Sequence, residues 1–128
     1  MEGKIVGPLD LVFYWVRDLD RAMAFYRDVL GLEAGRASAG QWAEFHAGAT
    51  TFALHAAAPG QPVQPGGATA VFRVDDLDAA KGALLARGVE FGFEGDVAGY
   101  ARFATFRDPD GNDVQLIEYA GPGTEEPR

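Results

Sequence analysis

The apolar positions in the first half of the chain predict a strand, a helix and a hairpin, in that order. Residues 9–16 are almost continuously apolar and rich in β-forming side chains, which is typical of a buried strand. Asp18 can cap a helix whose apolar residues then recur at helical spacing, and Gly31 ends that helix. The hairpin is expected from strands at residues 41–45 and 50–56, joined by a turn at residues 47–49.

The second half of the chain repeats this order of elements. Residues 68–74 predict a strand, Asp76 caps a helix, and Gly88 ends it. The apolar stripe of this helix is expected at Leu77, Ala80, Leu84 and Leu85. The remaining strands are expected at residues 89–93, 100–106 and 113–119, the last two around the turn Asp108-Pro109-Asp110-Gly111.

The two halves also match residue by residue, which indicates an internal repeat. Residues 13–22 return as 71–80 at an offset of 58, with Val, Asp, Leu, Asp and Ala in matching places. Later, Leu30-Gly31-Leu32 corresponds to Arg87-Gly88-Val89, and 42–45 corresponds to 103–106. We therefore predict an α+β fold in which two tandem βαβββ modules form a cupped mixed sheet. The single domain would span residues 1–128, with module one at 8–58, a linker at 59–67, module two at 68–120 and a flexible tail at 121–128.

Composition narrows the class of protein without naming a function. The chain has 128 residues, 48% of them hydrophobic, which is enough to bury a core. It has no cysteine, so disulfides, thiolate metal sites and thiol nucleophiles are excluded. The net charge of −8 disfavours nucleic acid and anionic membranes as partners and favours cationic ones. We see no signal peptide or membrane span in the sequence and expect a cytoplasmic protein.

Three strings give the chain a resemblance to a known family. They are VRDLD at 16–20, AFYRDVLGL at 24–32 and FRDPDGN at 106–112. With a doubled βαβββ unit, these strings resemble the vicinal oxygen chelate superfamily, which includes glyoxalase I, extradiol dioxygenases and bleomycin-resistance proteins. The likeness covers residues 8 to 120 and marks the fold, with Phe25 and Leu30 expected in the core; it does not mark a reaction.

The resemblance also implies where a metal would be bound in metal-using members. Their four ligand positions match Leu11, Ala53, Thr69 and Gln115 of this chain. Leucine and alanine cannot bind a metal, and threonine and glutamine are poor ligands without charged neighbours. A separate set formed by His46, His55, Glu44 and Glu118 offers no facial pair of histidines, with His46 expected to point away from Glu44. We therefore expect no metal and no other cofactor.

Alternation along the strands predicts which side chains line the cavity face. With a period of two, Val12, Tyr14, Val16, Phe72, Val74, Val114 and Leu116 pack beneath the helices, as do Phe45 and Phe106. The cavity face then carries Phe13, Trp15, Trp42, Glu44, His55, Thr69, Arg73, Phe103, Thr105 and Gln115, with Tyr100 at the rim. Aromatic side chains on a concave wall can hold flat, unsaturated ligands by stacking, although they could also simply fill space between modules or subunits.

Two polar residues on this face, His55 and Arg73, could do more than pack. His55 could contact a ligand or act as a general base, or it could be an ordinary strand-end histidine. If Arg73 lies on a central strand, its guanidinium needs a counter-charge, for which Glu44 or a ligand is a candidate. If Arg73 lies at a sheet edge in water, it says nothing about a binding site. Our interpretation places His46 in solvent beside the hairpin turn.

These observations favour a metal-free protein that binds a small molecule. By resemblance to the bleomycin-resistance branch, it would sequester a planar or cationic ligand, such as an antibiotic or aromatic metabolite, as a homodimer. The alternative is an isomerase, cyclase or lyase, metal-independent with His55 or Glu44 as base, or less favourably metal-dependent. A purely structural role in pairing with another protein stays open.

Overall fold

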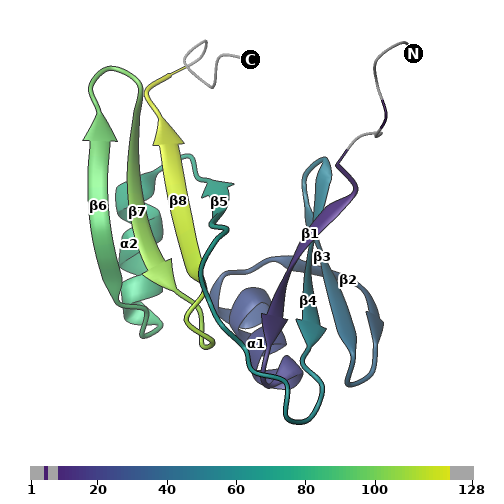
Figure 1. Cartoon of the computed structure of the whole chain (residues 1–128). Helices are drawn as coiled ribbons and strands as arrows, with labels where there is room; N and C mark the ends of the chain where they lie inside the picture. The colour runs from purple at the N-terminus through teal and green to yellow at the C-terminus, as the bar shows by residue number, and fades with distance from the viewer. Residues whose placement is uncertain (1–4, 6–8, 122–128) are drawn as a thin grey trace. The chain divides into compact units, whose positions relative to one another are not determined.

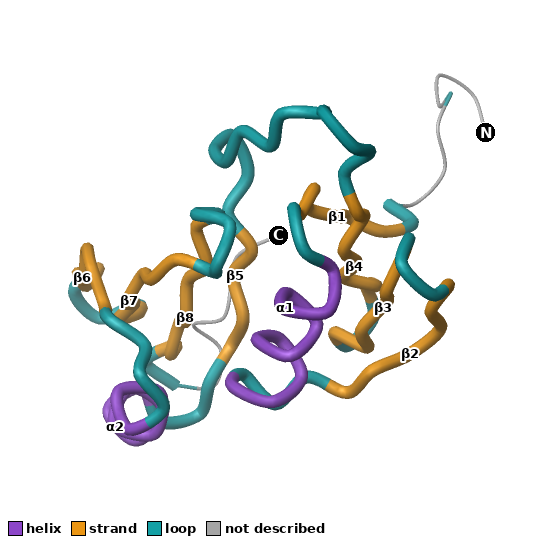
Figure 2. The backbone as a smooth tube through the Cα atoms, turned by 90° about the horizontal axis from the view of Figure 1, so that it is seen from below, coloured by secondary structure: helices purple, strands orange, loops and turns teal. Residues whose placement is uncertain are grey.

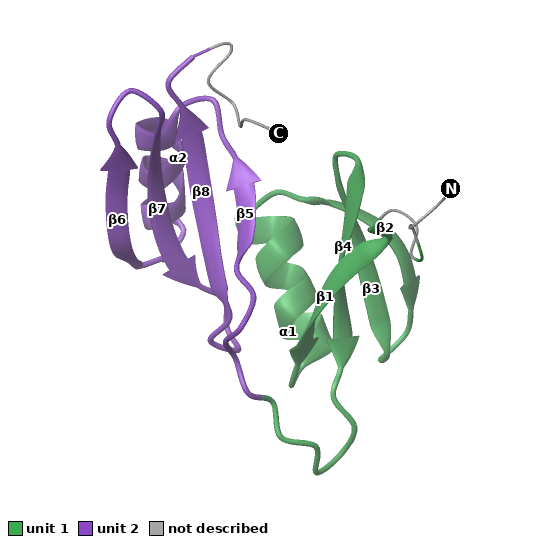
Figure 3. Ribbon diagram, turned by 45° about the horizontal axis from the view of Figure 1, so that its top comes forward, with its two compact units in different colours: residues 1–63 green, residues 64–128 purple. Residues whose placement is uncertain are grey.

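The computed structural model describes Ile5 and residues 9–121, and the chain divides into two compact units. The first unit is Met1–Val63 and the second is Gln64–Arg128 (Figure 3). The boundary falls inside the Pro- and Gly-rich segment that we expected to be a linker. Most of the expected flexible tail, residues 122–128, lies outside the described residues.

The first unit is a four-stranded mixed sheet with one helical segment. The sheet order is β1-β4-β3-β2, in which β1 and β4 are parallel and the other neighbours antiparallel (Figure 1). The helical segment connects β1 to the edge strand β2. Its elements are β1 (Leu11–Val16), α1 (Leu19–Ala24), the π-helix η1 (Phe25–Val29), β2 (Glu33–Ser38), β3 (Trp42–Ala47) and β4 (Thr50–Ala56).

The second unit repeats this architecture strand for strand. Its sheet order is β5-β8-β7-β6, with β5 and β8 parallel and the remaining pairs antiparallel (Figure 1). Both sheets are therefore built as βαβββ, and the predicted α+β class with two such modules is confirmed. The elements are β5 (Ala70–Arg73), α2 (Leu77–Ala86), β6 (Phe91–Val97), β7 (Ala101–Arg107) and β8 (Asp113–Tyr119).

Each helix lies on one face of its own sheet, and that face holds the core of the unit (Figure 2). In the first unit the fully buried Tyr26 packs against Phe45 and Phe52, with ring centroids 6.1 and 4.9 Å away. In the second unit Leu77 and Leu84 of α2 are buried together with residues of β7 and β8. The other side of each sheet is not covered by its helix.

Several core predictions were wrong in detail. Phe25 and Leu30 are only half-buried, because Tyr26 rather than Phe25 points into the core. Leu85 is 56% exposed, since it falls outside the stripe that α2 turns towards its sheet, and Val12 is 44% exposed although it lies on the helix side of β1.

The predicted helix caps are confirmed in both units. The Asp18 carboxylate accepts a hydrogen bond from the Arg21 amide at 3.1 Å, and Asp76 accepts one from the Ala79 amide at 3.0 Å. The structure departs from expectation in the first helix, whose second half is a π-helix from Phe25 to Val29. Neither helix in the described ranges is long and apolar enough to cross a membrane.

The strand β2 was absent from the sequence-based list of strands. Its residues, EAGRAS, are mostly exposed and carry no apolar alternation, because an edge strand is held mainly by its backbone bonds to β3. The turn between β7 and β8 has the expected place. There the buried Asp108 accepts hydrogen bonds from the amides of Asp110 and Asn112 at 2.9 and 2.8 Å, which holds the turn closed.

Candidate functional site

The uncovered side of the first sheet brings together five of the residues that the sequence placed on the cavity face. Trp15 of β1 lies opposite His55 of β4, and His55 lies opposite Trp42 of β3. One step along the strands, the next row on the same side is Phe13, Ala53 and Glu44. The two rows lie on one side because positions two apart on a strand share a face.

The rings of Phe13, Trp15, Trp42 and His55 form one continuous cluster, which we call the aromatic face. The centroid of Phe13 is 5.3 Å from that of Trp15, 5.6 Å from that of Trp42 and 5.5 Å from that of His55. His55 is also 4.3 Å from Trp15 and 5.5 Å from Trp42. Mutual edge and tilted contacts of this kind fix the orientation of each ring.

The aromatic face remains available to a ligand although its members pack on one another. Phe13 is 39% exposed and Trp15 40% exposed, whereas Ala53 beneath them is fully buried. A methyl group at that position leaves room for the larger rings on either side to close over it. The result is a rigid apolar surface that can stack a flat molecule without rearranging.

Glu44 is held at the edge of the aromatic face. Its carboxylate accepts a hydrogen bond from the indole nitrogen of Trp42 at 2.8 Å and lies 3.5 Å from the guanidinium of Arg36. The indole donor is thereby satisfied, which fixes the Trp42 ring. Of the two interpretations left open for Arg73, the structure favours the sheet edge: Arg73 is exposed on the edge strand β5, with its guanidinium 5.1 Å from the ring centre of Tyr119.

One ring nitrogen of His55 is engaged by the backbone. Its Nδ1 lies 3.0 Å from the carbonyl oxygen of Ala56, so in the neutral ring Nδ1 carries the proton and donates to that oxygen. The other nitrogen, Nε2, then keeps its lone pair. A ligand on the aromatic face would meet a hydrogen-bond acceptor or a base at this position.

A hollow of about 660 Å³ opens at the end of β1 and β4, next to the aromatic face. Trp15 and His55 line both. The rest of its wall comes from segments that follow the two parallel strands and from the turn before β3: Arg17, Asp18, Leu19, Asp20, Gly40, Gln41, Ala56, Ala57, Ala58, Pro59 and Gln61. We had not predicted this hollow. The signal was available, because the carboxyl ends of neighbouring parallel strands meet at one edge of a sheet.

His46 is exposed, as expected, but its expected direction was wrong. It lies on β3 two positions after Glu44, and residues two apart share a face. It pairs with Thr51 and with Glu33 of β2, and its Nε2 lies 3.3 Å from where a Cβ of Gly35 would be. His46 is thus on the same side as Glu44, outside the ring cluster.

The uncovered side of the second sheet has no comparable cluster among its described residues. Phe103 contacts Phe93 at 5.6 Å, Tyr100 contacts Tyr119 at 5.4 Å, and the Gln115 amide nitrogen lies 3.4 Å from the Thr105 hydroxyl. Thr69 is exposed and precedes β5, so it is not opposite Gln115, whose partner is Val71. The predicted residues of this module are therefore spread over the face in separate pairs.

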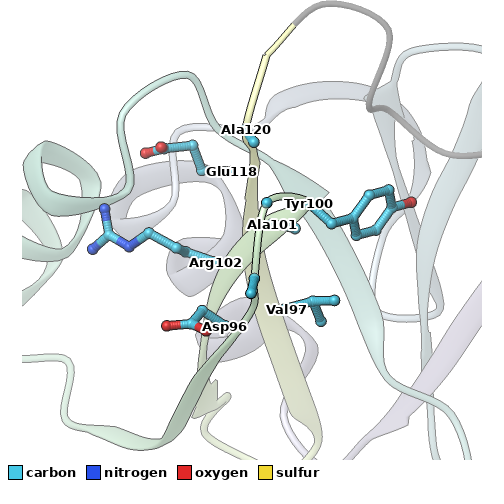
Figure 4. Close-up of a pocket in the computed structure, with 9 residues that line it drawn as sticks. Asp96, Val97, Tyr100, Ala101, Arg102, Glu118 and Ala120 are labelled. Atoms are coloured by element: carbon cyan, nitrogen blue, oxygen red, sulfur yellow. The ribbon is translucent and has the colours of Figure 1, made fainter.

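A smaller hollow of about 350 Å³ lies near the turn between β6 and β7. Figure 4 shows Asp96, Arg102 and Glu118 pointing to one side there and Tyr100 to the other. Two of these polar groups are already used, because Arg102 donates to Asp78 at 2.7 Å and Glu118 accepts from the Leu77 amide at 2.7 Å. Glu118, a candidate metal ligand in the sequence, thus caps helix α2.

The residues at the family's metal-ligand positions do not fit a metal ion. Leu11 and Ala53 have no donor atoms, and Ala53 is buried beneath the aromatic face. Thr69 and Gln115 bring only neutral oxygen ligands, and they are not opposite each other in the sheet. Across Ile5 and residues 9–121, no group of three or more His, Asp or Glu side chains is close enough to hold an ion. No step of a mechanism is therefore built on a metal.

Several solved structures share this fold over nearly the whole chain. An antibiotic-binding protein, TnmS3 from Streptomyces sp. CB03234, is 27% identical with a TM-score of 0.75, over 91% of this chain and 99% of that one. A lactoylglutathione lyase from Agrobacterium tumefaciens is 26% identical with a TM-score of 0.73, over 89% of this chain and 95% of that one. A glyoxalase/bleomycin resistance protein from Streptomyces sp. CB03234 is 28% identical with a TM-score of 0.69, over 87% and 100%. No curated protein matches significantly.

A match to a family model shows which superfamily the chain belongs to. The model of the glyoxalase/bleomycin resistance protein/dioxygenase superfamily matches residues 9–116. That span contains every strand and helix except the last three residues of β8. The likeness inferred from the sequence strings is confirmed, and the chain belongs to this superfamily.

Proposed function

We propose that the protein binds a planar, unsaturated organic molecule on the aromatic face of its first unit and holds it without altering it. The observation that carries this proposal is the interlocked cluster of Phe13, Trp15, Trp42 and His55, in which Phe13 and Trp15 are exposed and Trp42 and His55 are half-buried. Flat ligands gain most from such a surface because it buries their faces and needs no ordering when they bind. The similarity to TnmS3, an antibiotic-binding protein, supports an antibiotic or aromatic metabolite as the ligand.

Intrinsic fluorescence tests the proposal directly, because both tryptophans of the chain, Trp15 and Trp42, belong to the aromatic face. We expect saturable quenching by planar compounds such as emodin and proflavine and none by the bulky, saturated camphor. Calorimetric titration separates binding from optical absorption by the ligand. The absence of saturable binding across the planar panel would overturn the proposal, whereas recovery of an unchanged ligand after incubation supports sequestration over turnover.

A second candidate function rests on His55. Its Nδ1 is oriented by the Ala56 carbonyl, which leaves Nε2 as a base beside a surface that can hold a substrate. A metal-independent isomerisation, cyclisation or elimination could start from proton removal by this nitrogen. Glu44 is less suited to this role, since its carboxylate is engaged by Trp42 and Arg36. Turnover that survives EDTA and is lost in His55→Ala would favour this candidate.

Assembly and location complete the proposal. We propose that the protein is a homodimer in the cytoplasm, by analogy with the bleomycin-resistance branch. Sedimentation velocity at micromolar concentration gives the number of chains directly, and a single species with the mass of one chain would overturn the dimer. Fractionation of the producing cells tests the location.

A further inference from the structure

The hollow beside the aromatic face is placed to receive part of the same ligand. Trp15 and His55 belong to both surfaces, so a molecule stacked on the rings has a direct path into it. Its volume of about 660 Å³ lies within the range of roughly 300–1,000 Å³ that is usual for small-molecule sites. The hollow adds a concave extension at the edge of the aromatic face.

Three polar side chains in the wall of the hollow are held in place by the backbone. Arg17 donates from Nη2 to the Val63 carbonyl at 3.0 Å. Asp18 accepts from the Arg21 amide at 3.1 Å, and Gln61 accepts from the Ala58 amide at 2.9 Å. A side chain that is already fixed loses little conformational entropy when a ligand arrives, so these groups are pre-organised for recognition.

The wall presents donors and acceptors in alternation rather than one sign of charge. The Gln61 oxygen is used by Ala58, so its amide nitrogen remains to donate, while the exposed carboxylate of Asp20 accepts. Gln41 can do both. The charges of the wall are mixed, with the guanidinium of Arg17 and the carboxylates of Asp18 and Asp20, so an ion of either sign would meet both favourable and unfavourable partners. Hydroxyl groups, which donate and accept, complement such a wall better than either ion.

We propose that this hollow binds an uncharged, hydroxyl-rich substituent, such as a sugar, carried by the planar ligand. The inference rests on the proposed function and adds the chemical class of the ligand's second part. The apolar face of a sugar ring would pack on the exposed indole of Trp15, while its hydroxyls exchange hydrogen bonds with Gln41, Gln61 and Asp20.

The test compares a planar compound with its own glycoside. We expect emodin 8-O-glucoside to bind about tenfold more tightly than emodin in calorimetric titrations, which corresponds to one or two net hydrogen bonds. In Asp20→Ala and Gln41→Ala we expect the ratio of the two affinities to fall towards one. Asp75→Ala removes a similarly exposed carboxylate from the second unit and serves as the matched control, with the ratio unchanged.

Each outcome has a separate meaning. Emodin binding with no gain for the glucoside overturns the inference and leaves the proposed function standing. A gain that persists in both Asp20→Ala and Gln41→Ala also overturns it, because the sugar would then bind elsewhere. If neither compound binds, and no other planar compound does, the proposed function fails and the inference fails with it. Circular dichroism of each variant separates lost recognition from lost folding.

Discussion

The helix-covered sides of the two sheets are nearly interchangeable, whereas their uncovered sides are not. On the covered side, Ala43 and Phe45 of β3 are each 1% exposed, and their counterparts Ala104 and Phe106 of β7 are 0% and 2% exposed. At these two pairs of positions the same residue types fill the same places in both copies. These positions are set by packing against a helix, which leaves little freedom for change.

On the uncovered side, the row Trp15–His55–Trp42 of the first sheet corresponds to Arg73–Ile117–Phe103 of the second. Similarly, the row with Phe13 and Glu44 corresponds to one with Val71 and Thr105. The two copies therefore share these core positions on their covered sides and differ in the side chains on their uncovered sides. This contrast supports the proposal that the aromatic face binds a ligand.

The largest effect tests the equivalence of the two covered sides. We expect Phe45→Ala and Phe106→Ala each to lower the free energy of unfolding by about 3–5 kcal/mol, because both rings are almost fully buried. Urea unfolding followed by circular dichroism measures both. A cost below about 1 kcal/mol for one of them would show that the cores are not equivalent.

The next effect tests the contrast between the uncovered sides. Trp42→Ala should weaken emodin binding by about tenfold or more, because it removes a stacking ring and the partner that orients Glu44. The counterpart change, Phe103→Ala, should alter the affinity by less than about twofold, since surface away from a binding site contributes little. Calorimetry is the appropriate measurement, and comparable losses in the two variants would contradict the assignment to the first unit.

A smaller effect concerns the two helix caps. Asp18→Ala and Asp76→Ala should each cost about 1 kcal/mol of stability, because each carboxylate satisfies one free amide of its helix. The two values are expected to agree within about 0.5 kcal/mol, as the two cap geometries are alike. Thermal and urea unfolding of both variants measure the two costs. A clearly smaller cost in one variant would show that its helix depends less on its cap.

The smallest effect is a dependence on pH. The hydrogen bond from the Arg102 guanidinium lowers the pKa of the Asp78 carboxyl. A lowered folded-state pKa means that the stabilisation is present above the unfolded value of about 3.9 and is lost as pH falls through the folded value. Asp78→Asn should therefore be slightly less stable than the parent at pH 7, and the difference should vanish at the acid end of a urea series. A difference that grows with acid would contradict this account.

The pattern of apolar residues was enough to predict most of the fold. Alternation placed Phe45, Phe106 and Val114 in the core and Phe13 and Trp15 of β1 on the opposite side, and short-range capping rules located both helix starts. The strand β2 could not be found in this way, because its side chains face solvent and its place depends on pairing with β3. The two interpretations of Arg73 stayed open for a related reason, since the sequence does not show which strand lies at an edge.

The candidate site was only partly predictable. A period of two shows that Trp15, Trp42 and His55 can share a face, but not that they meet in one row. That meeting depends on the register of three strands, which the two-residue turn between β3 and β4 helps to set. The hollow beside Trp15 involves loops whose paths follow no periodic rule, so its polar wall became visible only in the structure.

The π-helix explains a small irregularity of the repeat. Asp18 and Gly31 are separated by 13 positions, whereas Asp76 and Gly88 are separated by 12, so the first copy carries one surplus residue in its helix. A wider turn absorbs one residue without shifting what comes before or after it. The π-helix from Phe25 to Val29 is thus explained either by a one-residue insertion in the first copy or by a one-residue deletion in the second. Trimming one residue there should regularise the helix and leave both strands that flank it in register.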